Sequence, residues 1–436
     1  MRFLGVTETC DLGALYMRLV AEGHEVRIAI DEPKAQGTLA GLVERTADWR
    51  GELDWIRAAG DEGIIIFEAV SEGFGALQDE LRRDGFSVVG GSAFGDRLEN
   101  DRHFAQKLLA DLGLQTAATR DFADFGSASA FIAAHPGRYV LKFSGADHQS
   151  GETYVGQIDD GRDVRAMLAA RLEARGDASA RFILMDHIEG VEMGVGAYFD
   201  GKNFLLPACL DWEHKRFFAG DLGEMTGEMG TVATFDRSGK FFGATLAKVA
   251  PILREHGHIG YVNLNTIVNE QGIWPLEFTC RFGYPGFAVL ESLQQTGWAE
   301  LLGMMTAGSG GRFSASPGFS VGIVLTTPPF PYSRKEINEP VGLPILISES
   351  FGEVDLRNLH FGEIGLIGDQ LVTSGLYGWT MVVTGTGPTI TAAQAEAYRR
   401  IGLIMVPNAR YRLDIGDRLI AGALARVERL GLLSAA

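Results

Sequence analysis

The chain has 436 residues, of which 46% are hydrophobic and 22% are charged. This composition supplies enough apolar mass for folded cores, excludes a mainly disordered chain, and at this length suggests about three domains. Acidic residues outnumber basic ones by 56 to 39, which gives a formal net charge of -17. We therefore exclude a protein that coats DNA or RNA, because binding a phosphate backbone requires an electropositive surface.

The sequence predicts a cytoplasmic protein without nucleic-acid or membrane partners, either a monomer or a homodimer. Its cysteines, Cys10, Cys209 and Cys280, are odd in number and lack CxxC spacing, which argues against a disulfide framework or a structural zinc site. The N-terminal segment carries acidic residues before any long apolar run, unlike a signal peptide. No stretch approaches the roughly 20 apolar residues that a membrane helix requires.

The first hundred residues alternate strands with helices. Apolar strands are predicted at 2–6, 25–30, 64–67 and 86–89, and amphipathic helices at 12–23 and 75–85. This alternation predicts a parallel sheet with crossover helices. The turn after the first strand reads VTETCDLG and has no GxGxxG, so a nicotinamide-dependent oxidoreductase is a disfavoured alternative.

From about residue 100 the pattern changes. A capped helix is predicted within 99–116 and another helix at 244–257, and the predicted strands and hairpins lie at 139–145, 152–158, 182–188, 192–210 and 261–283. The first hairpin is expected to turn at Asp200–Gly201, because Asp-Gly favours a tight turn.

The C-terminal part is predicted to be mixed. Strands are expected at 319–327, 363–368, 370–375 and 378–385, and helices at 391–402 and 414–431. A linker is expected at 305–318, which is rich in Gly and Ser. We therefore predict a multidomain α/β and α+β protein with an N-terminal α/β domain at 1–98, a central domain at 99–308 and a C-terminal mixed α/β domain at 309–436.

The segment LEFTCRFGYPG at 276–286 follows a predicted strand and carries a carboxylate and an arginine four residues apart. Glu277 can hold magnesium through a hard oxygen ligand, and Arg281 can bind phosphate through two parallel hydrogen bonds. The same spacing is common in surface or structural ion pairs, which remain the favoured alternative for the bare motif.

A second segment, at 211–230, joins a short cationic cluster to a glycine-rich loop. His214, Lys215 and Arg216 form the cluster, and four glycines follow within 220–230. Glycines allow backbone N–H groups to approach an anion closely, while the basic residues supply charge. A solvated charge run beside a flexible loop is the open alternative.

Two further positions could bind a nucleotide. Lys142 lies inside an apolar strand, where an inward-facing lysine needs an anionic partner and an outward-facing one does not. Asp186 and Glu192 lie around a strand end and turn, where backbone groups can read an adenine edge and a carboxylate can accept hydrogen bonds from ribose hydroxyls. Taken alone, Glu192 is more typical of an exposed turn.

In their order along the chain, these segments resemble the ATP-grasp ligases, and more closely the phosphoribosylamine–glycine ligases (glycinamide ribonucleotide synthetases). The family's D-H-K-R, T-G-G-M-G, E-F-N-x-R-F-G-D-P-E, V-T-x-G and R-x-D-I-G correspond here to 213–216, 226–230, 277–286, 372–375 and 412–416. The resemblance extends from about residue 85 to the C-terminus. The family's N-terminal G-N-G-G-R-E-H is missing.

The resemblance implies an ATP-grasp fold and an ADP-forming ligation of a small amino acid to an amine. A carboxylate would attack the γ-phosphate of ATP, and the amine would displace phosphate from the resulting acyl phosphate. ATP would bind with Mg²⁺ or Mn²⁺ between two antiparallel sheets of the central domain.

The resemblance also implies the site residues. Arg102 and Lys142 would hold the nucleotide phosphates, Asp186 and His187 the adenine, and Glu192 the ribose. The metal ligands would be Glu277 and Thr279 with an amide from the preceding strand, Asn265 or Asn263. The catalytic residues would be Arg281, on the transferring phosphoryl group, and Lys215 and Arg216, beside the acceptor's phosphate or the acyl phosphate. The five basic residues among these should converge on one cleft.

The chain departs from the family pattern at several positions. Thr279 replaces a metal-ligating asparagine, the loop at 146–151 has lost its lysine, and Tyr284 and Gly286 replace two carboxylates. These changes leave two alternatives: a divergent ligase that joins a different amino acid and amine, or a non-catalytic nucleotide-binding relative.

Overall fold

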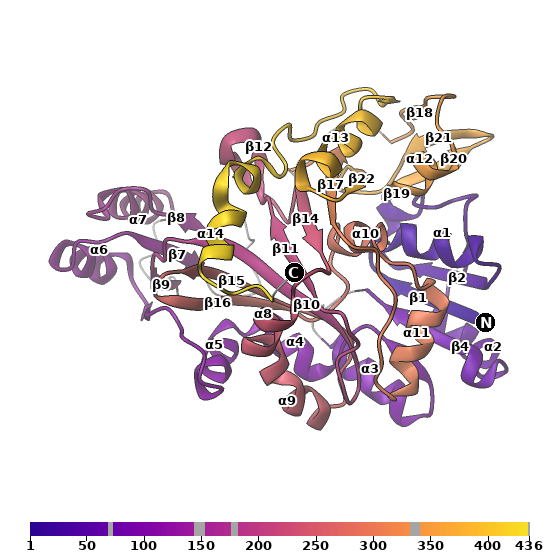
Figure 1. Cartoon of the computed structure of the whole chain (residues 1–436), viewed down its shortest axis with the longest axis horizontal. Helices are drawn as coiled ribbons and strands as arrows, with labels where there is room; N and C mark the ends of the chain where they lie inside the picture. The colour runs from indigo at the N-terminus through magenta and orange to yellow at the C-terminus, as the bar shows by residue number, and fades with distance from the viewer. Residues whose placement is uncertain (69–72, 144–152, 176–181, 332–340, 435–436) are drawn as a thin grey trace.

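The structure is a computed structural model that describes residues 1–68, 73–143, 153–175, 182–331 and 341–434 (Figure 1). Its larger sheets are a five-stranded sheet near the N-terminus, a four-stranded sheet in a projecting lobe and an eight-stranded sheet between them. The predicted loop at 146–151 lies outside the described residues. The predicted mixed α/β multidomain architecture is confirmed.

The N-terminal sheet is parallel throughout, as the strand–helix alternation predicts. Its spatial order is β3 (Glu44–Arg45), β2 (Glu25–Ile30), β1 (Arg2–Thr7), β4 (Gly63–Phe67) and β5 (Ser87–Val89). The helices of this region are α1 (Gly13–Ala21), α2 (Leu53–Arg57) and α3 (Phe74–Arg83). Every residue of β4 is buried, which explains its unbroken GIIIF sequence, because strands of covered parallel sheets are apolar on both faces.

The predicted capped helix near residue 100 is two helices, α4 (Ala93–Asn100) and α5 (Arg102–Asp111). Asp101 separates them, and its side chain caps α5 by accepting a hydrogen bond from the Phe104 N–H at 2.9 Å. Gln106 on α5 donates to the carbonyls of Pro275 and Leu276, so the helix is tied to a strand 170 residues away.

The four-stranded sheet forms the lobe at the left of Figure 1. It has the order β6 (Thr119–Phe122), β9 (Phe182–Asp186), β7 (Tyr139–Phe143) and β8 (Tyr154–Val155), and is antiparallel. Helices α6 (Phe125–Ala134) and α7 (Arg162–Arg175) pack beside it. Phe125, Ile132, Leu141 and Leu184 form part of its small core.

The eight-stranded sheet is antiparallel and dominates the centre of the molecule. Its order is β16 (Gly272–Thr279), β15 (Ile259–Asn269), β10 (Val191–Asp200), β11 (Cys209–Glu213), β14 (Gly230–Thr234), β17 (Phe319–Thr326), β22 (Trp379–Gly387) and β19 (Leu359–Phe361). The hairpin after β10 turns at Asp200–Gly201 as predicted. Gly201 has φ 86°, and the Asp200 carboxylate accepts hydrogen bonds from the backbone N–H groups of Lys202 and Asn203.

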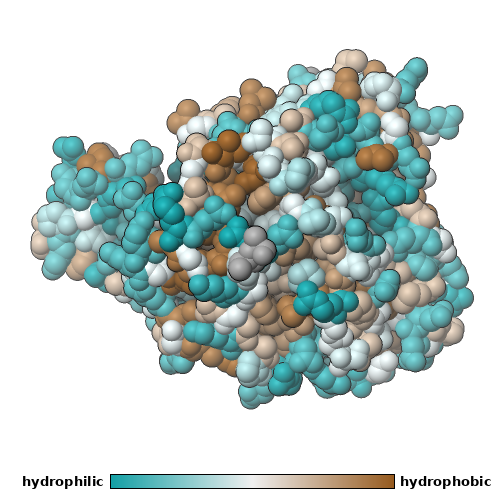
Figure 2. All heavy atoms as spheres, viewed as in Figure 1, coloured by the Kyte–Doolittle hydropathy of each residue, from teal (hydrophilic) through white to brown (hydrophobic). Residues whose placement is uncertain are grey.

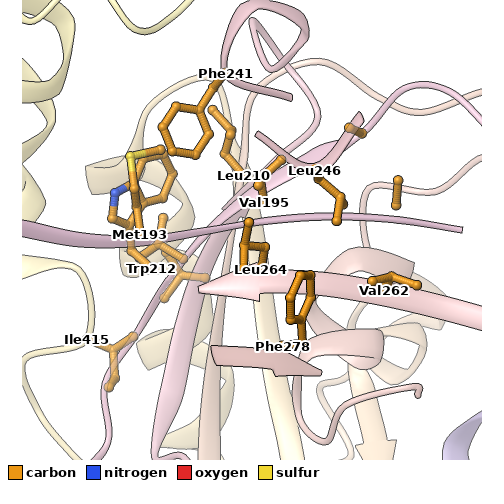
Figure 3. Packing of buried hydrophobic residues seen from close by; sticks show 14 of the residues in the cluster. Met193, Val195, Leu210, Trp212, Phe241, Leu246, Val262, Leu264, Phe278 and Ile415 are labelled. Carbon is orange, nitrogen blue, oxygen red and sulfur yellow. The ribbon is translucent and has the colours of Figure 1, made fainter. Parts of the chain in front are cut away.

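One face of this sheet holds the largest hydrophobic core. Met193, Val195, Leu210, Trp212, Val262, Leu264 and Phe278 point to that face, where they meet Phe241, Leu246 and Ile415 (Figure 3). These strand positions alternate with polar or glycine positions. Because successive side chains of a strand point to opposite sides, the alternation assigns the polar residues to the other face.

The C-terminal region continues the same sheet through β17, β22 and β19. The predicted domain boundary between residues 308 and 309 lies just after α11 (Trp298–Ala307), and strands on both sides of this boundary belong to the same sheet. The limits of the three domains stay predictions. In the described residues, the remaining α-helices are α8 (Gly239–Ala244), α9 (Ala250–Glu255), α10 (Gly286–Glu291), α12 (Glu353–Arg357), α13 (Ile390–Ile401) and α14 (Leu424–Arg429). The shorter strands are β12 (Arg216–Phe218), β13 (Leu222–Met225), β18 (Leu346–Ile347), β20 (Ile364–Ile367), β21 (Gln370–Thr373) and β23 (Ile404–Met405).

Three of the expected elements differ in extent. The helix expected at 244–257 is divided between α8, a short 3₁₀ segment and α9. The helix expected at 414–431 is interrupted at Gly422, which has φ 136°, and regular helix is confined to α14 after it. The first three residues of the expected linker at 305–318 belong to α11.

In the surface view, the lobe of the four-stranded sheet is mainly hydrophilic on the visible face (Figure 2).

Candidate functional site

The polar face of the eight-stranded sheet gathers charged side chains from four neighbouring strands. Glu192 lies on β10, Asn265 on β15 and Glu277 on β16, while Glu213 ends β11 and Lys215 follows it two residues later. Strand pairing sets Asn265 opposite both Gly194 and Glu277. Since residues two apart share a face, the register brings these groups together although up to 85 residues separate them.

Lys215 lies at the centre of this group. Its Nζ is 3.0 Å from Glu277, 3.1 Å from Glu213 and 3.4 Å from Glu192. Burial lowers the pKa of this ammonium, but the three carboxylates outweigh burial and raise the pKa well above its usual range. The site therefore holds one firmly protonated lysine among three acids.

Glu277 is bound by two cations from different parts of the chain. Besides Lys215, it accepts a hydrogen bond from Nη2 of Arg102 at 2.8 Å. Lys215 is the main reason why the pKa of Glu277 falls far below its usual range; burial opposes the shift, and Lys142 and Arg102 add to it. The carboxylate is thus fully ionised at the end of β16.

Two asparagines hold the acids of this face in position. Asn265 donates through Nδ2 to Glu192 at 2.9 Å and to Glu213 at 3.4 Å, and Asn263 donates to Asp211 at 2.6 Å. Gly194 lies opposite Asp211 in the β10–β11 ladder, and a Cβ built on it would lie 2.1 Å from Oδ1 of Asp211. The absence of a side chain at Gly194 therefore makes room for a buried carboxylate.

Lys142 reaches the same group from the four-stranded sheet. It lies on β7, and its pKa is lowered to about 8 by burial first and then by the neighbouring charge of Arg102 and Lys215, while Glu277 and Glu192 oppose the shift. Lys142 therefore points inward, which resolves the alternative that the sequence left open. It makes none of the ion pairs in the described part of the chain.

Asp186 and His187 lie at the end of β9, away from the acidic group. Asp186 accepts a hydrogen bond from Arg120 at 2.7 Å, and the backbone N–H of His187 donates to the carbonyl of Arg138. Burial lowers the pKa of the His187 imidazole. These contacts hold the connection between β9 and β10 against β6 and β7.

Two of the five basic residues expected to converge make other contacts. Arg281 pairs with Glu99 on α4 at 3.2 Å, and Arg216 donates to the carbonyl of Gly223 in the β12–β13 hairpin. The ion pair that the sequence allowed between Glu277 and Arg281 is therefore not formed. Arg102, Lys142 and Lys215 surround Glu277, whereas Arg281 and Arg216 bind other groups, so the structure does not show the expected convergence of all five basic residues.

Two further expected residues are Thr279 and His214. Thr279 lies opposite Asn263 in the β15–β16 ladder, on the same face as Glu277. The expected cationic trio is wrong at His214. Its side chain points to the opposite face from Lys215 and is 1% exposed. Burial and the charges of Arg418 and Arg412 lower its pKa to about 4. This imidazole is neutral, and its Nε2 accepts a hydrogen bond from the N–H of Gly416.

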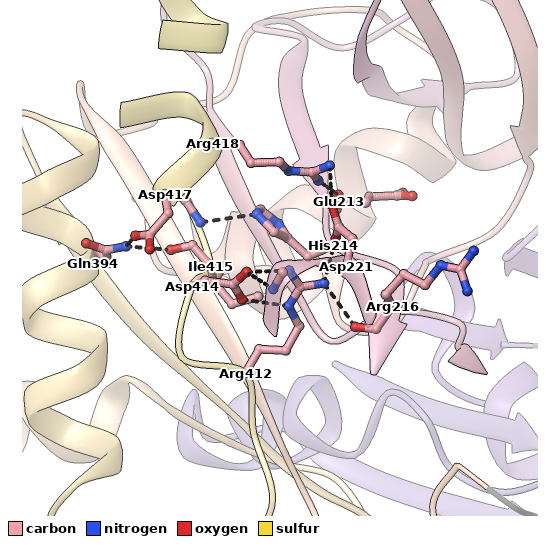
Figure 4. Close-up of polar contacts among 12 residues, drawn as sticks. Glu213, His214, Arg216, Asp221, Gln394, Arg412, Asp414, Ile415, Asp417 and Arg418 are labelled. Atoms are coloured by element: carbon pink, nitrogen blue, oxygen red, sulfur yellow. Dashed lines mark hydrogen bonds and ion pairs between the residues drawn. The ribbon is translucent and has the colours of Figure 1, made fainter. Parts of the chain in front are cut away.

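The segment at 412–416 fastens the C-terminal region to the loop that follows Lys215 (Figure 4). Arg412 is 1% exposed and pairs with Asp414 at 2.7 Å and with Asp221 at 2.9 Å. It also donates to the carbonyl of Arg216 at 3.0 Å. The C-terminal motif therefore positions the β12–β13 hairpin beside the charged group rather than supplying a reactive side chain.

Three acids of the site were missed in the sequence. Burial raises the pKa of Asp211 to about 7, and it also raises the pKa values of Glu213 and Glu228. The spacing D-W-E-H-K, with Asp211, Glu213 and Lys215 each two residues apart on a strand, could have placed the first two on one face. No comparable signal marked Glu228, which lies in a loop.

The described residues contain no group of three or more His, Cys, Asp or Glu side chains arranged to hold a metal ion. All three cysteines are buried free thiols. Among the helices of the described residues, none has the length and apolar character needed to cross a membrane.

Residues 100–287 match the family model described as "Phosphoribosylglycinamide synthetase, ATP-grasp (A) domain". The phosphoribosylamine–glycine ligase of Pseudomonas aeruginosa is 27% identical over 87% of this chain and 86% of its own length. That of Neisseria meningitidis is 25% identical over 92% and 95%. The crystal structure of the Thermotoga maritima phosphoribosylamine–glycine ligase superposes with a TM-score of 0.71 at 20% identity, covering 95% of this chain and all of that one.

Proposed function

We propose that this chain is an ATP-grasp ligase, similar to the phosphoribosylamine–glycine ligases, which joins a small carboxylic acid to an amine through an acyl phosphate and releases ADP and phosphate. The family model covers the four-stranded sheet and the strands that carry Glu192, Lys215 and Glu277. We also propose that the reaction takes place in the cytoplasm.

One observation carries this proposal. Arg102, Lys142 and Lys215 come from a helix, from the four-stranded sheet and from the eight-stranded sheet, and all three act on Glu277. The protein carries a net charge of -17, and these three cations from separate elements gather at one place, beside the carboxylates of Glu192, Glu213 and Glu277. A polyphosphate needs such a concentration of positive charge in a protein that otherwise repels it.

We assign the nucleotide to the space between the two sheets. Arg102 and Lys142 would bind its phosphates, and the segment at Asp186 and His187 would contact the adenine. Glu192 would accept hydrogen bonds from the ribose, for which it would exchange its contact with Lys215. The lowered pKa of Lys142 supports its share in phosphate binding, because a desolvated ammonium without a bound anion gains most from one.

The donor set of the sheet face fits a magnesium ion. Glu277, Thr279 and Asn265 offer a carboxylate, a hydroxyl and an amide oxygen, all of them hard ligands. The hydrogen bonds that Asn265 makes to Glu192 and Glu213 use Nδ2, so its Oδ1 is the atom available to a cation. Magnesium usually takes one or two protein carboxylates and completes its shell with phosphate and water. Bound there, it would neutralise phosphate charge.

The remaining assignments concern the transferred group. Lys215 would accompany the phosphoryl group as it leaves ATP, since its ammonium already lies beside Glu277. Arg281 and Arg216 would join from the border of the site, which requires Arg281 to leave Glu99 and Arg216 to leave the Gly223 carbonyl. Holding both reactants in line supplies much of the rate enhancement in such reactions.

The test is a chemical trap for the acyl phosphate. The protein is incubated with Mg-ATP, hydroxylamine and one carboxylic acid at a time, glycine first, and both ADP and hydroxamate are measured. Hydroxamate formation with any acid supports the proposal. If an acid is consumed and ADP is released but no hydroxamate forms, the proposed acyl-phosphate intermediate is contradicted.

A non-catalytic nucleotide-binding relative is the second candidate, favoured by the way Lys215 and Arg102 already neutralise Glu277. It predicts that Mg-ATP raises the melting temperature while ADP is released with no mixture of acids and amines. A panel that includes glycine with phosphoribosylamine separates the two candidates, and turnover of that pair alone would identify the activity of the named relatives.

A further inference from the structure

An aromatic cluster lies next to the charged group. Tyr284 follows β16, and Tyr377 and Trp379 lie at the beginning of β22. The ring of Tyr284 stacks on Trp379 with centroids 5.2 Å apart, and Tyr377 lies 5.1 Å from Trp379. Aromatic faces carry a negative quadrupole, which attracts cations and gives phosphate no favourable contact.

Carboxylates surround this cluster. The pKa of Tyr284 is raised well above its usual range by burial, then by the charges of Asp11, Glu363 and Glu228. The pKa of Tyr377 is also raised, by burial and by Glu8, Asp11, Glu363 and Glu32. Glu363 has a structural task, since it accepts hydrogen bonds from backbone N–H groups of residues 376–379. Arg281 is the cation that acts on Asp11.

Three polar groups of this region have no partner within the described chain. Glu228 is 8% exposed, and its Oε1 accepts no hydrogen bond. The hydroxyl of Tyr284 and the indole Nε1 of Trp379 are buried and equally unpaired. A buried carboxylate oxygen without a donor is costly, so its retention points to a donor that the protein itself does not supply.

The loop at 226–229 connects the aromatic cluster to the charged group. A Cβ built on Gly227 would lie 3.9 Å from Cζ2 of Trp379, so the loop runs along the indole ring. At its other side, the hydroxyl of Thr226 donates to the carbonyl of Lys215 at 2.7 Å. Glu228 is thus in a loop that runs from Trp379 to the segment of Lys215, and its carboxyl is close enough to Glu213, Asp211 and Lys215 for their charges to act on its pKa.

We infer that Glu228, Tyr284 and Trp379 form the amine subsite, and that the amine is an alkylammonium ion without a phosphate group. This inference rests on the proposed ligase function and names the class of its second substrate. A phosphorylated acceptor would meet Glu228 and Asp11, whose charges both act on Tyr284. An ammonium group gains from both acids and from the two stacked rings.

The chemistry balances with these groups. The bound ammonium favours the ionised form of Glu228, whose raised pKa makes it a stronger base; the ammonium gives one proton to this carboxylate, and the freed nitrogen lone pair attacks the acyl carbon. The C–N bond forms as the bond from carbon to the phosphate oxygen breaks, and phosphate leaves with that electron pair. The second nitrogen proton passes to the departing phosphate, and Glu228 returns its proton to water. No oxidant, reductant or further reactant is needed.

The test measures binding of butylammonium to the whole protein by isothermal titration calorimetry, in the presence of Mg-ADP, with ribose 5-phosphate as the phosphorylated competitor. Butylammonium should bind saturably, and Glu228→Gln should weaken it about tenfold, because the amide removes the charge and keeps the shape. Tyr284→Leu should weaken it about fivefold. Glu224→Gln, the same change four residues earlier in this segment, should leave the affinity within about twofold.

The outcomes separate this inference from the proposed function. Tighter binding of ribose 5-phosphate than of butylammonium overturns the inference. It is also overturned if the wild type and Glu228→Gln bind butylammonium equally tightly while their melting temperatures match. Mg-ADP binding without any butylammonium binding also overturns it and leaves the ligase proposal standing. Absence of Mg-ADP binding counts against the ligase proposal instead.

Discussion

The Nζ atom of Lys215 lies 3.0 Å from Oε1 of Glu277, although 62 residues separate the two in the chain. Glu277 lies near the end of β16 and Lys215 two residues after β11, and the two intervening strands carry Glu192 and Asn265 onto the same face. This ion pair holds together the ends of β11 and β16, where the phosphates are proposed to bind. It also makes Glu277 the most informative residue to change.

Glu277→Gln should reduce ATP turnover at least about a hundredfold, because the amide is a poor magnesium ligand and no longer attracts Lys215 and Arg102. The protein should still fold, since the substitution keeps the shape of the side chain and leaves Lys215 paired with Glu213 and Glu192. ADP release and thermal melting measure the two effects. Glu270→Gln, at an exposed pair with Arg426, is the matched control. Unchanged turnover in Glu277→Gln would remove this residue from the site.

Gly194→Ala should destabilise the protein by about 1–3 kcal/mol, the usual cost of overpacking. The added methyl group would lie 2.1 Å from Oδ1 of Asp211, so either the carboxylate or the β10–β11 pairing has to shift. Gly243→Ala is the control, because a Cβ on that helical glycine meets nothing within 4 Å. Urea unfolding should show lower stability for the first variant and equal or higher stability for the second. Equal stability of both would mean that Asp211 is free to move.

Arg412→Met should cost about 3 kcal/mol, because it removes a buried guanidinium and leaves the partly buried Asp414 without this cation, while Asp221 keeps its pair with Arg418. Arg412 is 1% exposed and holds Asp414, Asp221 and the carbonyl of Arg216. Arg426→Met, at the exposed pair with Glu270, should stay within about 0.5 kcal/mol. The two variants are compared by denaturant unfolding. A small effect at both positions would show that the C-terminal segment is not held by this pair.

The affinity for Mg-ATP should fall as the pH rises through about 8. Burial and neighbouring cations lower the pKa of Lys142 from 10.5 to about 8, so the ammonium that binds phosphate is lost above that value. Bound phosphate would favour the protonated form, which links binding to proton uptake. Lys142→Arg should abolish this dependence, because a guanidinium stays charged. Titrations between pH 7 and 9.5 measure it, and identical slopes for both proteins would contradict the assignment.

The same shift has a defined effect on stability. Between pH 8 and 10.5 the unfolded chain holds a proton on Lys142 that the folded protein has lost, so the contribution of this group to the free energy of unfolding increases with pH across that window. Below pH 8, Lys142 is protonated in both the folded and the unfolded state, so the folded protein carries the full free-energy cost of burying this charge. Lys142→Met should remove this part of the pH dependence, as urea unfolding at several pH values would measure.

The sequence by itself determined the elements that carry the site. Alternating polar and apolar residues identified the strands of the central sheet, and the Asp-Gly pair identified the turn after β10, because these are local consequences of side-chain periodicity and backbone preference. The motif that ends β16 located Glu277 at a strand end. Lys142 was recognised as a candidate, and its inward orientation was left open because a single strand does not reveal what covers it.

The tertiary structure decided which charges meet. Arg281 pairs with Glu99 rather than with Glu277, His214 is buried and neutral beside a charged Lys215, and Asp211, Glu213 and Glu228 join the site. Ion pairs depend on register and on the approach of elements that are distant in the chain, and neither is written in a local pattern. The contact between Tyr284 and Trp379 likewise exists only because the segment after β16 reaches the start of β22, a strand that is not its neighbour in the sheet.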